Sequence, residues 1–181
     1  TYVYGLAING NYLYAAGYFS SVSSVPGTDH VARWDMVHST WEALGSGVDG
    51  TCYDFAFDAA GNVYVAGVFT NAGGVPANNV VRWTGTTWEA LGSGLNDNCN
   101  SLAIGPDGLL YAGGRFTTAG GVPANYVAKW DGSSWLPLGS GTVGYVNDLV
   151  FDSAGTLYAG GEFLVAGGQT VNYIAKWKVK K

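Results

Sequence analysis

Short apolar runs follow one another along the whole chain, and each run ends at glycine, asparagine, aspartate or serine. Residues 147–152, NDLVFD, and 156–163, TLYAGGEF, are two such runs around the turn SAG, and 173–177, YIAKW, is a third. The fourth run of the pattern is seen in 133–141, SSWLPLGSG. Runs of this length, rich in Val, Leu, Ile and aromatic residues, predict β-strands. Apolar residues do not recur with a period of 3.6, so we expect essentially no helix.

The four-run pattern belongs to a repeated unit. Residues 70–94 and 117–141 match without a gap at 16 of 25 positions, and three aromatic positions recur at spacings of 47 to 50 residues. These positions are Tyr14, Tyr64, Tyr111 and Tyr158; Phe19, Phe69, Phe116 and Phe163; and Trp34, Trp83, Trp130 and Trp177. We therefore expect one repeat domain over residues 1–181, with copies at about 1–47, 48–94, 95–141 and 142–181.

A unit of four antiparallel strands cannot bury both faces of its own sheet, so it must stack on further copies of itself. Four-stranded sheets arranged around an axis form a β-propeller. We expect an all-β propeller, or part of one, made of four blades, in which the repeated aromatic residues pack between blades. The segment AGGVPAN at 119–125 is expected to be a turn-forming loop between the second and third strands.

Two motifs carry a resemblance to a known family. A strand that ends in a double glycine (LYAGGRF, 110–116; LYAGGEF, 157–163) is followed by two tryptophans around a Gly/Ser turn (KWDGSSW, 129–135). This arrangement resembles the kelch-type propeller repeat, and the same segments are similar to bacterial secreted propellers and to the extracellular repeats of Rax2-like surface proteins. Kelch units usually place a tyrosine ahead of the second tryptophan, whereas Trp34, Trp83 and Trp130 take that place here. The resemblance implies a fold and is almost silent about function.

The composition excludes some partners. Charged residues make up 12% of the chain and the formal net charge is −5. Four of the eight basic residues stand singly before a tryptophan, and Lys178, Lys180 and Lys181 form a C-terminal tail that we expect to be solvated. We therefore expect no nucleic-acid binding. Without an apolar run of about 18 residues we also expect no membrane insertion. The acidic balance and the Gly/Thr/Asn-rich repeats favour a secreted or cell-surface protein.

The fourth copy lacks the fourth run. The chain starts at the first strand of copy one and stops after the third strand of copy four, YIAKWKVKK. We expect either a fragment of a longer repeat array or a protein that closes by association with another chain. Both alternatives leave a free strand edge, at which a protein partner or another copy of the chain would bind.

Residues suited to catalysis are few. His30 and His38 occur only in the first copy and are expected to be surface or turn residues, because neither has an evident metal-ligand set or nucleophile beside it. Galactose oxidase carries a kelch-like propeller, but its copper-site constellation has no counterpart here, and a shared fold does not transfer function. Cys52 and Cys99 lie one repeat apart, either as small residues at the start of a blade or as a disulfide between neighbouring blades. We expect that the protein is not an enzyme.

Two carboxylates give the one hypothesis for a metal. Asp54 and Asp148 occupy the same repeat position, where the other copies carry Gly5 and Ser101. If these carboxylates face the propeller axis, they would hold a hard cation such as calcium through oxygen ligands. The alternative is that they cap the turn or strand end. No other cofactor is expected.

The residues that fail to repeat are the candidates for binding. The connections between copies, at 48–51, 95–98 and 142–145, differ in every copy, and loops on a rigid scaffold commonly carry function. The candidates are Asp49, Tyr53, Asn96, Asp97, Asn98 and Tyr145, with Arg115 and Glu162 at the variable position of the G-x-F motif. We interpret the chain as a non-catalytic extracellular module for binding, adhesion or self-assembly. A carbohydrate-binding lectin is the first alternative, and an enzyme with a site on the propeller face is the second.

Overall fold

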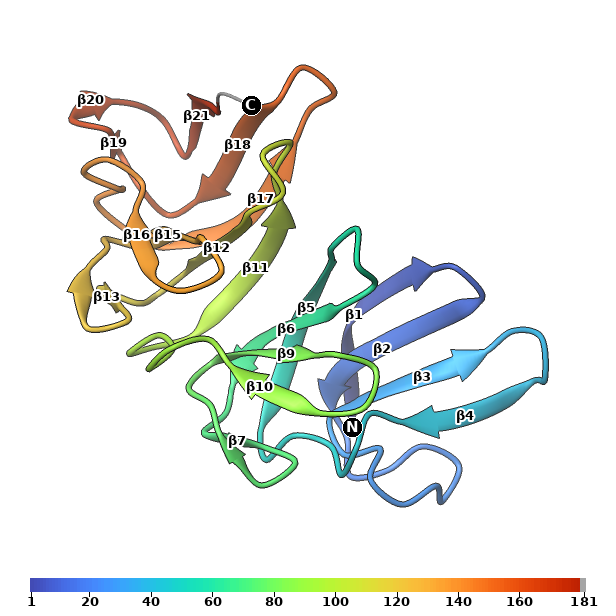
Figure 1. Ribbon diagram of the computed structural model, residues 1–181. Coiled ribbons are helices and arrows are strands. Elements are labelled where there is room, and N and C mark those ends of the chain that lie inside the picture. The colour runs from blue at the N-terminus through green and yellow to red at the C-terminus, as the bar shows by residue number, and fades with distance from the viewer. Residues whose placement is uncertain (180–181) are drawn as a thin grey trace.

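The computed structural model describes residues 1–179, and these residues form strands, turns and loops without any helix (Figure 1). Lys180 and Lys181, part of the expected solvated tail, lie outside the described residues. Within residues 1–179, no helix has the length and apolar character that crossing a bilayer requires. The prediction of an all-β chain is confirmed.

Four antiparallel sheets make up the body of the molecule. Sheet 1 contains β1 (Tyr2–Asn9), β2 (Tyr12–Tyr18), β3 (Val31–Asp35) and β4 (Thr40–Ala43). Sheet 2 contains β5 (Thr51–Phe57), β6 (Val63–Val68), β9 (Val80–Trp83) and β10 (Trp88–Ala90). Sheet 3 contains β11 (Cys99–Ile104), β12 (Leu110–Gly114), β15 (Val127–Trp130) and β16 (Trp135–Pro137). Sheet 4 contains β17 (Val146–Phe151), β18 (Thr156–Gly161) and β21 (Ile174–Lys178).

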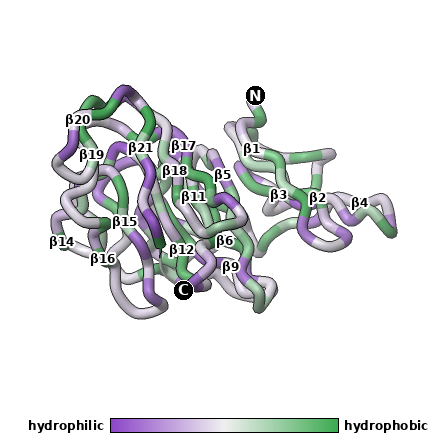
Figure 2. The backbone as a smooth tube through the Cα atoms, turned by 90° about the horizontal axis from the view of Figure 1, so that it is seen from above, coloured by the Kyte–Doolittle hydropathy of each residue, from purple (hydrophilic) through white to green (hydrophobic). Residues whose placement is uncertain are grey.

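The first strands of the four sheets lie next to one another, because β1 contacts β5, β5 contacts β11 and β11 contacts β17. The sheets follow each other along an arc, with sheet 1 at one end and sheet 4 at the other (Figures 1 and 2). Three apolar clusters fill the three seams between neighbouring sheets. In each seam, a tyrosine of the second strand packs on the first strand of the following sheet, as the Tyr14 ring does against Phe57 at 5.0 Å. Apolar burial between sheets is the main source of stability in such an arrangement.

Tryptophans join the outer strands of sheets 2 and 3 to the sheet before each of them. The indole Nε1 of Trp88 donates a hydrogen bond of 2.9 Å to the carbonyl of Leu44, and Trp135 donates one of 2.8 Å to Leu91. Both indoles are buried, and each satisfies a carbonyl that would otherwise lose its hydrogen bond to water. The expected aromatic packing between repeats is therefore present, with a directional contact added to it.

The long loops between second and third strands are small hairpins. They contain β7 (Asn71–Ala72) with β8 (Val75–Pro76), β13 (Thr118–Ala119) with β14 (Val122–Pro123), and β19 (Val165–Ala166) with β20 (Gln169–Thr170). The turn of the second hairpin needs glycine, since Gly120 and Gly121 have φ of 60° and 79°. The AGGVPAN segment is therefore a turn-forming connection, as expected from its sequence.

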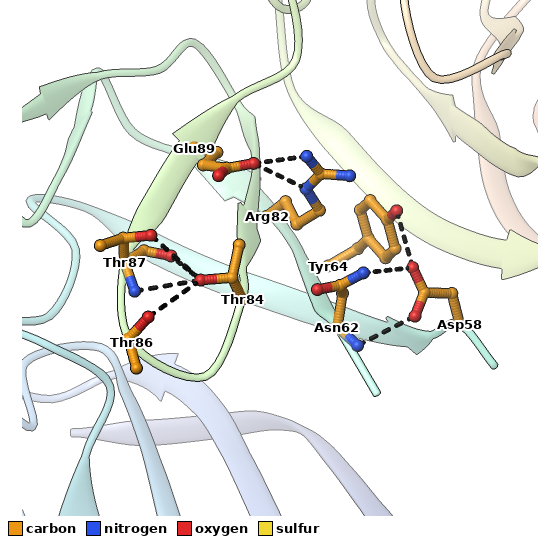
Figure 3. A network of polar contacts seen from close by, with 8 residues as sticks. All are labelled: Asp58, Asn62, Tyr64, Arg82, Thr84, Thr86, Thr87 and Glu89. Carbon is orange, nitrogen blue, oxygen red and sulfur yellow. Dashed lines mark hydrogen bonds and ion pairs between the residues drawn. The ribbon is translucent and has the colours of Figure 1, made fainter. Parts of the chain in front are cut away.

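The aspartate in the turn between β5 and β6 holds that turn and the strand that follows it through several hydrogen bonds. Asp58 accepts hydrogen bonds from the backbone and side-chain nitrogens of Asn62 and from the Tyr64 hydroxyl (Figure 3). In the same sheet Arg82 of β9 pairs with Glu89 of β10, directly opposite in register. These contacts fix the ends and the outer edge of the sheet.

Sheet 4 has three strands among the described residues, so one edge of β21 lacks the neighbour that β9 has in β10 and β15 has in β16. This is the missing fourth strand that the sequence predicts. The unpaired edge bears backbone groups available to another strand.

Candidate binding site

Asp49 and Asn96 occupy equivalent positions in the repeat, and each accepts hydrogen bonds from the backbone of its loop hairpin. Asp49 Oδ1 accepts hydrogen bonds of 2.9 Å from the backbone nitrogens of Thr70 and Asn71. Asn96 Oδ1 accepts bonds of the same length from Thr117 and Thr118. Each side chain thus holds the start of its loop hairpin. Both residues also line a hollow of about 640 Å³ between sheets 2 and 3. They therefore shape the loop surface that we predict from the sequence to bind a ligand.

The other two candidates of this connection lie in the same turn. Asp97 is exposed, and its carboxylate accepts a hydrogen bond of 2.7 Å from the backbone nitrogen of Asn98. The carbonyl of Asn98 in turn accepts a hydrogen bond from the backbone nitrogen of Arg115. These contacts fix the backbone and leave the Asn98 amide without an intramolecular partner among the described contacts.

Arg115 and Tyr145 meet at the seam between sheets 3 and 4. The Arg115 guanidinium lies over the Tyr145 ring, 4.8 Å from its centre, and the Tyr126 ring packs edge-on against Tyr145 at 5.7 Å. A cation over an aromatic face is attracted by the ring quadrupole. The backbone nitrogen of Glu162 donates a hydrogen bond of 2.8 Å to the Tyr145 carbonyl, which places this third candidate at the same corner.

Tyr53 belongs to a bulge that recurs in every first strand. The pairing of β5 with β6 shifts between Cys52 and Asp54, and the same shift occurs in the other three sheets. The residues in the bulge are Tyr4, Tyr53, Asn100 and Asn147. The Tyr53 ring lies 5.5 Å from that of Tyr4, edge to face, and burial raises the pKa of its hydroxyl. The bulge therefore directs this candidate toward the neighbouring first strand.

Asp54 and Asp148 come together at one hydroxyl. Ser101 Oγ lies 3.0 Å from Asp54 Oδ2 and 3.1 Å from Asp148 Oδ1, so the three equivalent positions of sheets 2, 3 and 4 form one polar cluster. Asp54 Oδ2 also accepts a hydrogen bond of 2.8 Å from the backbone nitrogen of Leu102. Burial, opposed by these hydrogen bonds and reinforced by the charge of Asp148, raises the pKa of the Asp54 carboxyl.

This cluster offers two carboxylates and one hydroxyl to a cation. Among the described residues no group of three or more His, Cys, Asp or Glu side chains is arranged to hold a metal. Calcium prefers six to eight oxygen ligands. The capping role is visible in the hydrogen bonds, while an axial cation stays a prediction. Sequence reasoning missed Ser101 as the third member, although its position in the repeat places it between the two aspartates.

The histidines and cysteines are engaged in local structure. His38 is exposed in a turn and its Nδ1 lies 2.7 Å from Asp35 Oδ2, a contact that raises the pKa of His38. His30 lies in the bend before β3 and is half-buried, with a φ of 61° and its ring 5.6 Å from that of Tyr18. Cys52 and Cys99 are free and buried, so the disulfide alternative is not the one observed.

An apolar groove lies beside the free edge of β21. It has a volume of about 510 Å³ and is lined by Tyr158, Ala166, Gly167, Gln169, Val171, Ile174, Ala175, Lys176 and Trp177. In sheet 3 the corresponding space is filled by Trp135, whose Cβ would lie 3.2 Å from a Cβ added to Gly120. At Gly167 the nearest such atom is 4.0 Å away, on Trp177 Nε1. The groove is thus the place that a fourth-strand tryptophan occupies in the other sheets.

A family model matches two segments of the chain. A β-propeller domain of unknown function, DUF5122, matches residues 61–83 and 105–129. The first segment contains β6 and β9, and the second contains β12 and all but the last residue of β15; each also contains the loop hairpin between its two strands. None of the curated proteins matches the chain.

Solved structures agree on the fold. PorZ, a bacterial surface component of the type-IX secretion system of Porphyromonas gingivalis, has a TM-score of 0.59 and 12% identity over 94% of this chain and 27% of its own. A protein described as a gluconolactonase has a TM-score of 0.58 and 16% identity over 93% and 61%. The extracellular domain of a one-component system from B. thetaiotaomicron has a TM-score of 0.57 and 13% identity over 89% and 20%.

The architecture, the family model and these likenesses together define a β-propeller repeat protein. At 12% to 16% identity, the likeness to these three structures shows the fold alone. The chain spans between 20% and 61% of the length of these three structures. Two of the three are extracellular or surface components.

Proposed function

We propose that the chain is a non-catalytic binding and assembly module of a secreted or cell-surface protein, built on kelch-type propeller sheets. The observation that carries the proposal is the free edge of β21 beside an apolar groove. An exposed strand edge pairs readily with an extended segment, and the pockets next to it select the side chains. Here the groove fits a tryptophan, because Trp88 and Trp135 fill the equivalent space in sheets 2 and 3.

The ligand of this edge is therefore an extended segment that carries a tryptophan followed by a turn. In the chain itself, residues 133–141, SSWLPLGSG, are a segment of this kind, and they pair with β15 through Trp135 and its neighbours. The carbonyl of Leu138 supports the same interpretation. Leu44 and Leu91 at the equivalent positions accept an indole hydrogen bond, whereas no tryptophan donates to Leu138 among the described contacts.

A synthetic SSWLPLGSG peptide tests this function directly. We expect saturable binding to the 181-residue chain, measured by calorimetry, and loss of binding when alanine replaces the tryptophan of the peptide. Equal binding of both peptides, or binding of neither, would contradict the proposal. The matched protein variant is Gln169→Trp, at an exposed position that lines the groove, whose indole would occupy the groove and compete with the peptide.

Non-catalytic action agrees with the state of the reactive groups. Burial raises the pKa of both the Cys52 and Cys99 thiols, which keeps them protonated and poorly nucleophilic. His38 is paired with Asp35 in an exposed turn. Cys52, Cys99 and His38 do not line either of the two hollows described above.

Carbohydrate binding is the second candidate, favoured by one observation. Tyr145 is partly exposed and has the Arg115 guanidinium over its ring, which combines an aromatic surface with hydrogen-bond donors. A glycan array with the wild type and Tyr145→Ala tests it. A glycan bound by the wild type and lost in the variant would support a lectin, and the absence of any bound glycan would remove this candidate.

A further inference from the structure

The two end sheets expose apolar positions that are buried everywhere else in the repeat. Leu6 on β1 is 66% exposed, while its equivalents Phe55, Leu102 and Leu149 are 5% to 7% exposed. At the other end, Ile174 on β21 is 65% exposed, while Val31, Val80 and Val127 are fully buried. Each seam is formed by one face from each of two neighbouring sheets. Sheet 1 and sheet 4 each have one such face that no other sheet covers among the described residues.

We define the leading face by Leu6 and Ile8 on β1, and the trailing face by Asp148, Tyr158 and Ile174 on sheet 4. Ile8 is also exposed, at 68%. Tyr158 is half-buried, whereas Tyr14, Tyr64 and Tyr111 are buried in the seams. Sheets 1 and 4 stand at opposite ends of the arc, so one chain does not bring these faces together (Figures 1 and 2).

The seam between sheets 2 and 3 shows how such faces fit. Its leading side is Leu102 and Ile104, the same two residue types as Leu6 and Ile8. Its trailing side is Tyr64 and Val80, which bury the leading pair in one cluster. Tyr158 and Ile174 repeat this trailing side with one methylene more.

The polar part of that seam is repeated as well. Asp54 Oδ2 accepts the backbone hydrogen of Leu102 across the seam, at 2.8 Å. Asp148 holds the position of Asp54 in sheet 4, and among its described hydrogen bonds Oδ1 is the oxygen that accepts from Ser101 and from its neighbour Leu149. Asp148 Oδ2 therefore corresponds to Asp54 Oδ2, and it would accept a hydrogen bond from the backbone nitrogen of Leu6 in a second copy.

The bulge residue supplies a second polar contact of the same kind. Asn100 Nδ2 donates a hydrogen bond of 2.8 Å to the Val146 carbonyl of the next sheet. Asn147, its equivalent in sheet 4, is exposed. Val3 is the equivalent of Val146 in sheet 1, so its carbonyl is the matching acceptor.

We propose that a second copy of this chain docks head to tail, with its leading face on the trailing face of the first copy, through contacts that repeat the seam between sheets 2 and 3. In this seam Leu6 and Ile8 of the second copy pack on Tyr158 and Ile174, and Asp148 accepts the Leu6 backbone hydrogen. Such a heterologous contact closes into a ring or continues as a row, according to its rotation. The proposal rests on the assembly role described above and concerns the sheet faces. Tyr158 and Ile174 of the trailing face also line the groove beside β21, whereas Leu6 and Ile8 lie outside it, so Leu6→Asp separates the two sites.

The mass of the chain in solution tests this seam. Sedimentation equilibrium over a wide concentration range is expected to give association beyond the 18.9 kDa of one chain. Leu6→Asp and Ile174→Asp are each expected to weaken association at least tenfold. Both side chains are exposed in a single copy, so unchanged circular dichroism and thermal unfolding show that the variants fold. The control is Val37→Asp, which changes an equally exposed residue in the β3–β4 turn and is expected to leave association unchanged.

Mixing the two defective variants gives the sharpest result. Leu6→Asp keeps an intact trailing face and Ile174→Asp keeps an intact leading face, so the mixture is expected to form pairs that neither variant forms alone. A wild-type chain that stays monomeric at every concentration, or a mixture that does not pair, would overturn the proposal. Association that is unaffected by Leu6→Asp would also overturn it while leaving strand uptake at β21 intact. If the SSWLPLGSG peptide does not bind but association is weakened by Leu6→Asp, strand uptake at β21 is wrong and the seam between copies stands.

Discussion

The Ser101 hydroxyl lies within 3.1 Å of an aspartate in the preceding sheet, Asp54, and of another in the following sheet, Asp148. A serine hydroxyl has one hydrogen to donate, so the two carboxylates share it. The backbone nitrogen of Leu149 donates to the same oxygen at 3.2 Å. One small side chain therefore connects the first strands of three sheets.

Replacement of this serine is expected to destabilise the fold. Hydrogen bonds to charged groups contribute about 1.5–3 kcal/mol, so Ser101→Ala should lower the free energy of unfolding by about that amount. Urea denaturation measures the change. Ser153→Ala in an exposed turn is the control and should stay within about 0.5 kcal/mol of the wild type. Equal effects of the two substitutions would show that the shared hydroxyl contributes nothing.

The carboxyl of Asp54 is expected to titrate above its ordinary value of 3.8, because burial disfavours its charged form. A raised pKa in the folded state means that the folded protein binds this proton more tightly than the unfolded chain. The stability from this group is therefore present below pH 3.8 and is lost as the pH rises through the folded pKa.

Carboxyl carbon shifts in an NMR titration measure this pKa. Asp148→Asn removes a neighbouring negative charge, so it should move the Asp54 pKa back toward 3.8. An Asp54 that titrates at or below 3.8 in the wild type would contradict the account of the cluster.

The indole hydrogen bonds between sheets are expected to be visible in stability. Trp135→Phe removes the donor to the Leu91 carbonyl and leaves that buried acceptor unpaired, which costs about 1–3 kcal/mol. Trp41→Phe is the matched control, because this half-buried indole makes no such bond among the described contacts. Thermal or urea unfolding compares the two. A larger loss for Trp41→Phe would show that the bond does not join the sheets.

Neither thiol is expected to react in the native protein. Cys52 and Cys99 are fully buried, and burial raises the pKa of each thiol, so the thiolate needed for reaction is absent near neutral pH. A chromogenic thiol reagent should label neither residue in buffer and both in guanidinium. Rapid labelling of the folded chain would indicate that the first strands open locally.

Much of the architecture could be predicted because the repeat reports on packing. Tyr64, Phe69 and Trp83 recur at fixed spacing because each packs in one of the seams between sheets, and glycine recurs where the hairpin needs positive φ. Among the described residues, sheet 4 likewise has the three strands that the sequence predicts for the fourth copy.

Other features depend on neighbours that a sequence does not display. Asp49 and Asn96 differ in residue type, yet the side-chain oxygen of each accepts a hydrogen bond from the backbone 21 residues later. Their spacing of 47 residues was the one indication in the sequence that they have the same role. Leu6 occupies the same repeat position as Phe55, Leu102 and Leu149, which are buried, so its sequence predicts a buried residue. Only the arrangement of the sheets reveals that Leu6 is exposed among residues 1–179.

Hydrogen–deuterium exchange at β21 tests the central claim, that the free edge of sheet 4 takes up a tryptophan-bearing strand. Amides of Ile174–Lys178 that point away from β18 should exchange rapidly in the isolated chain, and addition of SSWLPLGSG should slow them. Amides of β15, which already pairs with β16, should not change and serve as the internal reference. Protection confined to β21 is the result that the account predicts. Unchanged exchange at β21 under saturating peptide, or protection elsewhere, would contradict it.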